Sequence, residues 1–387
     1  MTDSTGAVLH TLCLLILVVQ SGRCTESPVS EWPSSTEDYD PLLSGPVDYS
    51  DFVTQCDKED VRSFRQVFLP AVYALVCVLG MVGNVLVVLT YLYFKRLRTM
   101  TDVYLLNLAL ADLLFLLTLP FWAVSVVLGW VFGPAMCKVV HGLYRLSFIS
   151  GMLLLMCISV DRYFSIVRAA SAHRHRSRAV YCSKLVAVAV WVLSALFAIP
   201  DLVYSEQQAG DGSMRCRLRQ DNSTFIYTTG LQLSLGFVLP LLVMGFCYTV
   251  VIRTLLLARN FEKNKAIKVV IAVVLVFLLF QLPYNSVLLL DTITDVNVTV
   301  TDCQLSKRMV LAVDITKSLA YTRCCLNPFL YAFIGVKFRR DLLKLLKEMG
   351  CLGSRSLLKL VAGRPTGFNG TRSSMVTDTD STTTFSP

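Results

Sequence analysis

Several charged residues lie inside, or at the ends of, long apolar runs of the sequence. Asp112 stands within one run, Lys317 and Arg323 stand within another, and the adjacent Asp161 and Arg162 close a third. A charge in the interior of a bilayer is costly, so charges that occur there usually bind a ligand, an ion or an opposite charge. These five residues are the first candidates for binding and switching chemistry.

The composition identifies the elements that carry these charges as membrane helices. Of the 387 residues, 54% are hydrophobic and 16% are charged, whereas soluble domains carry about 25% charged residues. The net charge of +9 does not indicate nucleic acid, because the basic residues are spread over short loops and form no soluble basic face. No nucleic-acid partner is expected.

Seven apolar runs approach or exceed the length of about 20 residues that a helix needs to cross a bilayer. They are residues 68–94, 103–128, 137–160, 185–200, 226–252, 269–290 and 309–336. The fourth is short unless it borrows residues 180–184. The predicted fold class is therefore an all-α membrane protein, a seven-transmembrane helix bundle over residues 67–336.

Charge asymmetry orients this bundle. Lys and Arg gather in the loops between runs one and two, three and four, and five and six, and again after run seven. The positive-inside rule places these segments in the cytoplasm. The amino terminus is then extracellular, and the protein is predicted to be a multi-pass protein of the plasma membrane.

The amino-terminal region precedes the bundle. Residues 1–24 contain a short apolar run and small residues at a cleavage site, and they are predicted to be a signal peptide, with an uncleaved disordered tail as the alternative. Residues 25–66 form an extracellular tail rich in Asp and Glu, with Tyr39 and Tyr49 among the acids. Acidic flanks suit tyrosine sulfation, and an anionic tail speeds the capture of a basic ligand. The alternative is a tail that is merely solvated.

Four of the 13 cysteines lie beyond the signal peptide on the oxidising side of the membrane. They are Cys56, Cys137, Cys216 and Cys303. Four cysteines allow three pairings, and the residues alone do not choose among them. Asn222 begins the sequence Asn-Ser-Thr and Asn297 begins the sequence Asn-Val-Thr, each in an extracellular loop. Both are predicted glycosylation sites.

Two different segments follow the seventh run. Residues 337–351 carry Leu342, Leu345 and Leu346 on one face and bases elsewhere. This pattern predicts a short amphipathic cytoplasmic helix, the eighth, on the membrane lipid, with Cys351 as a palmitoylation site. Residues 352–387 show no apolar periodicity and are predicted to be a disordered Ser/Thr-rich tail.

Short motifs in or at the end of six of the seven runs resemble those of the rhodopsin-like G-protein-coupled receptors. In order they are Gly83-Asn84-Val85, Leu108-Ala109-Leu110-Ala111-Asp112, Asp161-Arg162-Tyr163, Trp191, Pro240 with Tyr248, and Asn327-Pro328-Phe329-Leu330-Tyr331. Each motif is weak alone, but the set is specific because every member falls on the appropriate run. The resemblance extends from about residue 56 to residue 351.

Further features are similar to those of the chemokine receptors within that family. They are Thr118-Leu119-Pro120-Phe121-Trp122 in the second run and an extra pair of outer cysteines, Cys56 and Cys303. The resemblance implies the disulfides Cys56–Cys303 and Cys137–Cys216. The segments S-A-H-R-H-R, F-Q-L-P-Y-N and T-T-T-F-S-P narrow it to receptors that guide leukocytes to lymphoid tissue.

This resemblance implies a function and assigns residues to it. Basic CC-type chemokines would bind outside, a Gi-type heterotrimeric G protein and arrestin would bind inside, and chemotaxis and lymphoid homing would follow. The implied ligand-binding residues are Tyr39, Tyr49, Trp122, Tyr144, Gln281, Tyr284 and Lys317. The implied G-protein-coupling residues are Asp161, Arg162, Tyr163, Tyr248 and Tyr331. The implied activation core is Asn84, Asp112, Pro240, Pro283, Arg323, Asn327 and Pro328.

Two departures from the family pattern occur at these positions. Gln281 replaces a Trp that many receptors carry, and Lys317 replaces an acid that many chemokine receptors use against basic ligands.

In many relatives the acid at the position of Asp112 binds sodium. Here Arg323 is expected to face Asp112 and replace the ion, with a different partner for Arg323 as the alternative. Asp161 is expected to restrain Arg162 in the resting state.

The carboxyl-terminal tail concentrates hydroxyl groups on the cytoplasmic side. Its predicted phosphorylation sites are Ser373, Ser374, Thr377, Thr379, Ser381, Thr382, Thr383 and Thr384. Each phosphate adds a charge of about −1.5 to −2 at neutral pH. The resemblance implies that the resulting anionic strand binds a basic groove of arrestin.

Other functional classes fit less well. An atypical scavenging chemokine receptor without G-protein signalling is the alternative, because Phe164 and Ser165 depart from the family motif beside the intact Asp161-Arg162-Tyr163. A transporter or channel would need polar residues along several helices or broken helices at the midplane. An enzyme is the least expected class, since no carboxylate pair or metal-ligand cluster is apparent; no cofactor is predicted.

Overall fold

Helices make up almost all of the chain that the structure describes. In this computed structural model the described residues are 56–94, 97, 99–167, 176–210, 213–219, 222–257, 263–297, 303–334 and 336–348, and side chains are described outside 176–177, 222–226, 263–273, 294–297 and 329–339. All of them belong to the compact unit Cys56–Pro387. The predicted signal peptide, most of the acidic tail with its tyrosines, Cys351 and the phosphorylation sites lie outside this description.

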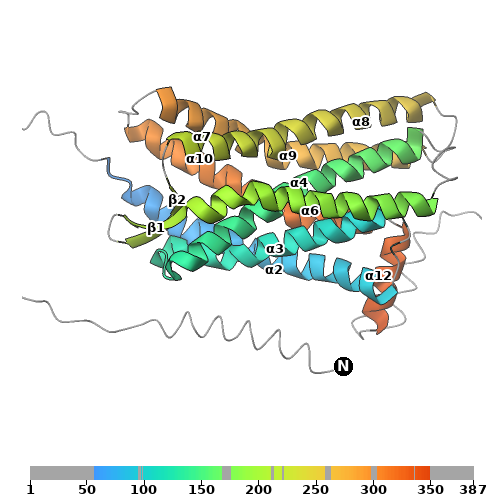
Figure 1. Cartoon of the computed structure of the whole chain (residues 1–387), viewed down its shortest axis with the longest axis horizontal. Coiled ribbons are helices and arrows are strands. Elements are labelled where there is room, and N and C mark those ends of the chain that lie inside the picture. Colours follow the sequence, from blue (N-terminus) through green and yellow to red (C-terminus); the bar gives the residue numbers. More distant parts are fainter. Residues whose placement is uncertain are drawn as a thin grey trace, which may run out of the picture. The chain divides into compact units, whose positions relative to one another are not determined.

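The long helices of this unit run side by side along a common direction (Figure 1). The first six spans are α2 (Glu59–Phe94), α3 (Met100–Leu128), α4 (Gly133–Val167), α6 (Arg176–Tyr204), the fifth built from α7 (Asn222–Leu233), η2 (Ser234–Val238) and α8 (Leu239–Leu257), and α9 (Lys263–Asn297). Six described helices are long and apolar enough to cross a membrane. They correspond to the first six predicted runs.

The seventh predicted run folds as two helices, α10 (Cys303–Tyr321) and α11 (Arg323–Ile334). Thr322 separates them, and both its amide, at 3.2 Å, and its hydroxyl, at 2.6 Å, donate to the carbonyl of Leu319. Four charged side chains make α10 more polar than the other spans. Polar residues in a span are tolerated where they face the bundle interior, so α10 is an expected place for function.

The fifth span widens at a π-helical turn before Pro240. Proline has no amide hydrogen, so the carbonyl of Gly236 lacks its usual donor. The amide of Leu239 instead donates to the carbonyl of Ser234, which is the longer π-type bond. A Cβ atom at Gly236 would overlap the ring of Phe148 on α4, so glycine permits the close approach of η2 to α4.

An antiparallel hairpin in the second outer loop is not part of the predicted all-α fold. It consists of β1 (Ser205–Gly210) and β2 (Ser213–Leu218), with Gln207 opposite Cys216. The amide of Trp130 donates to the carbonyl of Met214 at 2.7 Å, which holds β2 against the end of α3. Gly129 ends α3 with φ 76°, a left-handed conformation that glycine adopts without strain.

The packed core lies between α3, α4, α8 and α9, and α4 is the most buried span. Leu108 of α3 packs there with Ile149, Met152 and Leu154 of α4, and all four are fully buried. Large apolar side chains on the outward faces of the helices are exposed, among them Leu242. Exposed apolar side chains of this kind suit contact with lipid.

The last described helix, α12 (Val336–Glu348), runs across the direction of the spans (Figure 1). It packs against α2 and α11. Leu345 is buried, whereas Lys344 and Lys347 are exposed. An amphipathic helix with this division of faces suits the membrane interface.

Candidate functional site

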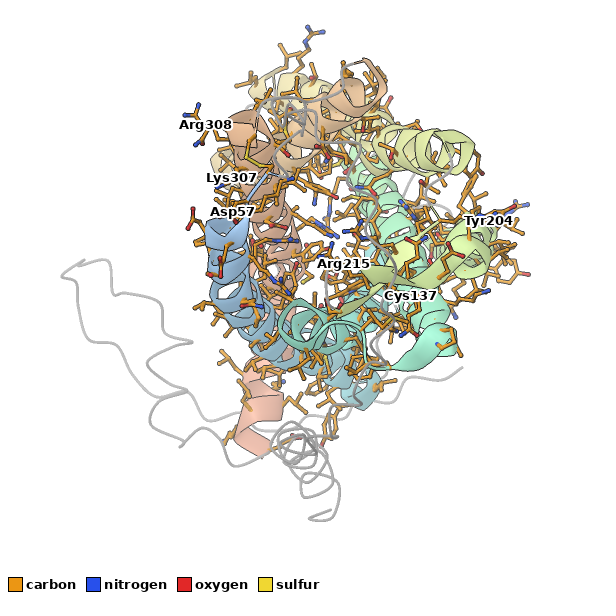
Figure 2. The ribbon with its side chains drawn as sticks, turned by 90° about the vertical axis from the view of Figure 1, so that its left-hand side faces the viewer. Asp57, Cys137, Tyr204, Arg215, Lys307 and Arg308 are labelled. Carbon is orange, nitrogen blue, oxygen red and sulfur yellow. A yellow bond between two sulfur atoms is a disulfide. The ribbon has the colours of Figure 1, made fainter. Side chains whose placement is uncertain are left out.

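Figure 2 looks onto the end of the bundle that carries the hairpin, where Asp57 and Lys307 lie on one side of the rim and Cys137 and Tyr204 on the other. Two disulfides hold this face. Cys56 is bonded to Cys303, and Cys137 is bonded to Cys216, which confirms the predicted pairings. The first joins the beginning of the described chain to α10, and the second joins α4 to β2. The outer ends of α10 and α4 are thus covalently tied to neighbouring outer segments.

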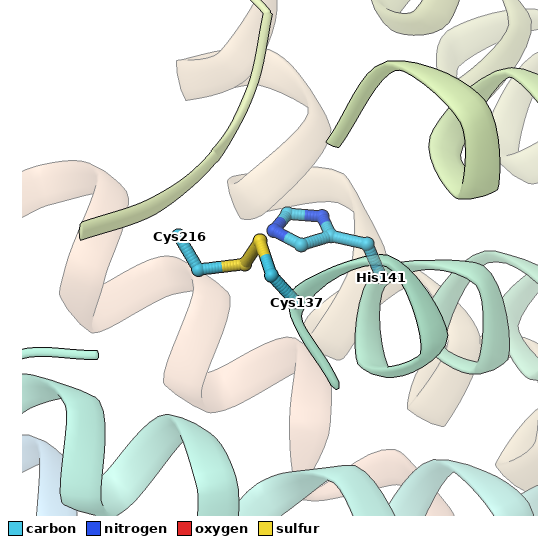
Figure 3. Close-up of side chains that lie close together, drawn as sticks. All are labelled: Cys137, His141 and Cys216. Atoms are coloured by element: carbon cyan, nitrogen blue, oxygen red, sulfur yellow. A yellow bond between two sulfur atoms is a disulfide. The ribbon is translucent and has the colours of Figure 1, made fainter. Parts of the chain in front are cut away.

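His141 lies against the second disulfide (Figure 3). A nitrogen of its ring and the sulfurs of Cys137 and Cys216 lie within 4.8 Å of one another, as metal ligands would. Metal ions bind the deprotonated thiolate, however, and both sulfurs are already bonded to each other. This trio is therefore a packed disulfide with a neighbouring imidazole rather than a metal centre.

A cavity inside the bundle is the candidate site. Its lining comes from four spans: Asp112, Phe115, Tyr144, Ser147, Phe148, Gln281, Tyr284, Ala320, Tyr321, Arg323 and Cys324. Three residues implied as ligand contacts, Tyr144, Gln281 and Tyr284, thus meet two implied activation residues, Asp112 and Arg323. One cavity connects the two predicted sets.

The other two described residues implied as ligand contacts lie beside this cavity. The ring of Trp122 stands edge-on to that of His141, with centroids 4.8 Å apart, and Trp122 packs against the cluster that contains the cavity residues Phe115 and Tyr321. The Nζ atom of Lys317 lies 5.7 Å from the ring centroid of Tyr321, within range of a cation–π contact. Tyr321 lines the cavity, so Lys317 is one side chain away from it.

A buried polar network flanks the cavity, and the sequence analysis missed it. Arg145 Nε donates to Asp201 Oδ2 at 2.9 Å, and Arg145 Nη1 donates to Gln232 Oε1 at 3.1 Å. Gln232 Nε2 in turn donates to the Tyr284 hydroxyl at 3.1 Å. The side chains of Arg145 and Asp201 are only 7% and 3% exposed. The isolated Arg in the third apolar run was the available signal.

Asp112 has a different hydrogen-bond partner from the predicted one. Asn327 Nδ2 donates to Asp112 Oδ2 at 2.6 Å. Arg323 forms no salt bridge with Asp112 in the described part of the chain, and its Nε and Nη1 atoms have no hydrogen-bond partner. A direct salt bridge between Asp112 and Arg323 is therefore not formed among the described residues. Both residues nevertheless line the same cavity, and their charges interact across it.

Small residues make room for these core contacts. A Cβ atom at Gly151 would lie 3.6 Å from Arg323 Nη2, so the glycine borders the guanidinium. A Cβ atom at Gly83 would lie 2.9 Å from Pro328 Cγ, closer than such atoms pack. Asn84 beside it donates through Nδ2 to the carbonyl of Cys324 at 3.1 Å, which ties α2 to α11.

The cytoplasmic end of α4 also departs from the expectation. The Thr101 hydroxyl of α3 donates to Asp161 Oδ2. The Arg162 side chain makes no ion pair or hydrogen bond within the described residues, so the expected direct contact with Asp161 is not formed. The two charges interact only at longer range. Adjacent helix residues point in different directions, and Thr101 reaches the acid instead.

The remaining implied coupling residues surround this end. Ser159 Oγ donates to the buried Tyr248 hydroxyl at 3.0 Å. The ring of Tyr163 lies 6.1 Å from that of Phe246, centroid to centroid. Pro283, which belongs to the implied activation core, lies within α9. The side chains of Tyr331, Asn222 and Asn297 lie outside the described residues.

Comparison with known proteins gives consistent matches over most of the chain. Residues 83–331 match the family described as 7 transmembrane receptor (rhodopsin family). C-C chemokine receptor type 7 of Homo sapiens is 56% identical over 344 residues, 88% of this chain and 90% of that receptor. The receptor of the same name from Bos taurus is 54% identical over 345 residues, again 88% and 90%. C-C chemokine receptor type 9 of Homo sapiens is 45% identical over 327 residues, 84% and 87%.

Proposed function

Because the chain belongs to the chemokine receptors of the rhodopsin family of seven-transmembrane receptors, we propose that it binds basic CC-type chemokines and directs leukocyte chemotaxis and lymphoid homing. As a family member it is a multi-pass receptor of the plasma membrane that responds to chemokines through a G protein. The cavity carries the finer proposal, since it brings Tyr144, Gln281 and Tyr284 together with Asp112. A ligand contacting the first three would act directly beside the contact of Asp112 with Asn327.

The charge of the amino-terminal tail supports a basic ligand. Residues 25–60 contain ten Asp or Glu residues and a single Lys, with no Arg. Such a segment attracts a basic protein over a Debye length of about 8 Å at physiological ionic strength. Sulfation of Tyr39 and Tyr49 would add further negative charge. The tail therefore favours rapid association, while the cavity contacts favour residence.

The cytoplasmic side supports coupling to a Gi-type G protein and to arrestin. Arg162 lies at the end of α4 without an ion pair in the described chain, so its guanidinium has hydrogen-bond donors to offer a partner. The carboxyl-terminal hydroxyls, once phosphorylated, would offer arrestin an anionic strand. These two partners use different segments, so each can be removed separately.

A panel of CC-type chemokines applied to cells that express the full-length receptor tests the proposal. At least one basic member should lower cAMP and release calcium. An Arg162→Ala variant at the same surface level is the matched control, since it should bind that chemokine without lowering cAMP. Uptake of chemokines without any fall in cAMP by the unmodified receptor would overturn the proposal and favour a scavenging receptor.

A further inference from the structure

Two acids near the outer half of the cavity are already neutralised by arginines. Arg145 Nε lies 2.9 Å from Asp201 Oδ2. Arg65 Nε lies 2.6 Å from Asp314 Oδ2. Each pair brings one positive and one negative charge together, so neither acid is left to bind a cationic group of a ligand.

Lys317 is a cation without such compensation. It makes no ion pair and no hydrogen bond within the described residues, and its Nζ atom faces the ring of Tyr321. Asp314, one helical turn earlier, interacts with Lys317 electrostatically but forms its salt bridge with Arg65. The ring face alone does not replace a counter-ion, because a cation–π contact is weaker than a charge-assisted hydrogen bond.

Two described groups other than acids also interact with Lys317. Its charge interacts with His141 of α4 and with Tyr284 of α9. The Tyr284 oxygen accepts a hydrogen bond from Gln232 Nε2 at 3.1 Å, which leaves its own O–H free to donate. Lys317 Nζ lies 5.7 Å from the ring centroid of Tyr321, and Tyr321 and Tyr284 line the same cavity. Lys317 and Tyr284 therefore offer an ammonium group and a phenol donor beside one cavity. This donor set suits an anion and repels an amine.

We propose that Lys317 and Tyr284 form a carboxylate subsite for an acidic side chain of the chemokine segment that enters the bundle. This inference rests on the proposed function, and it divides the ligand by charge. The basic surface of the chemokine faces the acidic tail of the receptor, whereas one Asp or Glu reaches Lys317. The free carboxyl terminus of the ligand is the other source of a carboxylate, and the experiment separates the two.

A double-mutant cycle on full-length receptor in cell membranes tests the subsite. The probe is a chemokine of the panel that activates the unmodified receptor. Each of its Asp and Glu residues is changed in turn to Asn or Gln, and a further form carries a carboxyl-terminal amide. The receptors are unmodified, Lys317→Met and Lys307→Met. Lys307 is a matched control because it lies on the same helix and already pairs with Asp60, at 3.6 Å.

One acidic position of the ligand should be coupled to Lys317. Lys317→Met should lower the affinity for the unmodified chemokine by about tenfold to a hundredfold, the loss of one hydrogen bond to a charged group. The chemokine whose acidic residue is changed to Asn or Gln should bind the unmodified receptor as weakly as the unmodified chemokine binds the Lys317→Met receptor. It should lose no further affinity on the Lys317→Met receptor. Lys307→Met should change the affinities for both ligands by the same factor.

Each other result has a defined meaning. Suppose that, for every acidic residue, the loss of affinity caused by the ligand change and the loss caused by Lys317→Met combine as a simple product. The two positions are then independent, and the subsite is refuted. Coupling of Lys317 to the carboxyl-terminal amide would also overturn it, in favour of the ligand terminus. If Lys317→Met does not reach the surface, Lys317→Glu with a ligand whose acid is changed to Lys replaces it, and failure to recover affinity refutes the subsite. If none of the chemokines in the panel activates the receptor, the proposed function itself is refuted.

Discussion

The buried pair of Arg145 and Asp201 should dominate the stability of the outer half of the bundle. Asp201→Leu leaves the guanidinium with Gln232 as its remaining side-chain partner, and Arg145→Met leaves the carboxylate without its cation. Breaking one side of a buried pair costs about 3–5 kcal/mol in the free energy of unfolding. At roughly 2 °C per kcal/mol, each single variant should unfold about 6–10 °C below the unmodified receptor.

The double variant Arg145→Met with Asp201→Leu should be far less damaged than the sum of the single changes. Replacing a buried pair by apolar residues is often neutral. The remaining cost is the unpaired Gln232 Oε1 atom, about 1–3 kcal/mol for a buried acceptor. The coupling energy between the two positions is then several kcal/mol. Two independent packing contacts would give a coupling energy near zero.

Thermal unfolding of purified receptor in detergent measures these differences. Labelling by a thiol-reactive dye can report unfolding, because Cys247, Cys324 and Cys325 are free and buried. Lys307→Met is the control, since its partner Asp60 is 95% exposed and such pairs contribute about 0–1 kcal/mol. Single variants that unfold at the unmodified temperature, or a double variant as unstable as the summed singles, would refute the reasoning.

Four further outcomes are expected. Arg162→Ala should keep surface expression and chemokine affinity but abolish G-protein activation; normal activation would contradict its role. Gly236→Ala should lower the free energy of unfolding by about 1–3 kcal/mol through overpacking, whereas Gly245→Ala, with nothing within 4 Å of the added atom, should not. Exchange of sodium for choline should change chemokine affinity by less than about threefold, because a fixed cation already lines the cavity of Asp112; a strong sodium effect that vanishes in Asp112→Asn would count against this. Changing the hydroxyl residues of 377–384 to Ala should reduce arrestin recruitment sharply and spare initial G-protein activation, and undiminished recruitment would assign arrestin to other segments.

Length and hydropathy predict the spans well but not their ends. The second run begins at Val103, whereas α3 begins at Met100. The reason is a polar cap: Thr99 accepts from the amide of Asp102, and the Asp102 side chain accepts from the amide of Thr99. Such reciprocal bonds extend a helix beyond its apolar part. The capping box is visible in the sequence, but an apolar-run analysis passes over it.

Partners far apart in the chain are harder to predict. Arg145 and Asp201 are 56 residues apart, and Asn327 and Asp112 are 215 apart. Periodicity along one helix indicates which residues face inward, but it does not indicate which inward residue of another helix lies opposite. The hairpin has a clearer local signal, since Asp211-Gly212 is a dipeptide typical of tight turns.

Two basic residues of the seventh span, Lys317 and Arg323, share one electrostatic consequence. Arg323 lines the cavity, and Lys317 lies over the ring of Tyr321, which lines the same cavity. Among the acids around them, Asp201 and Asp314 are paired with arginines, and only Asp112 lacks a salt bridge in the described chain. A cavity with this balance attracts anionic groups and repels cations. Weak sodium dependence and preference for a carboxylate therefore have a common cause but depend on different residues, so Lys317→Met should abolish the second and leave the first intact.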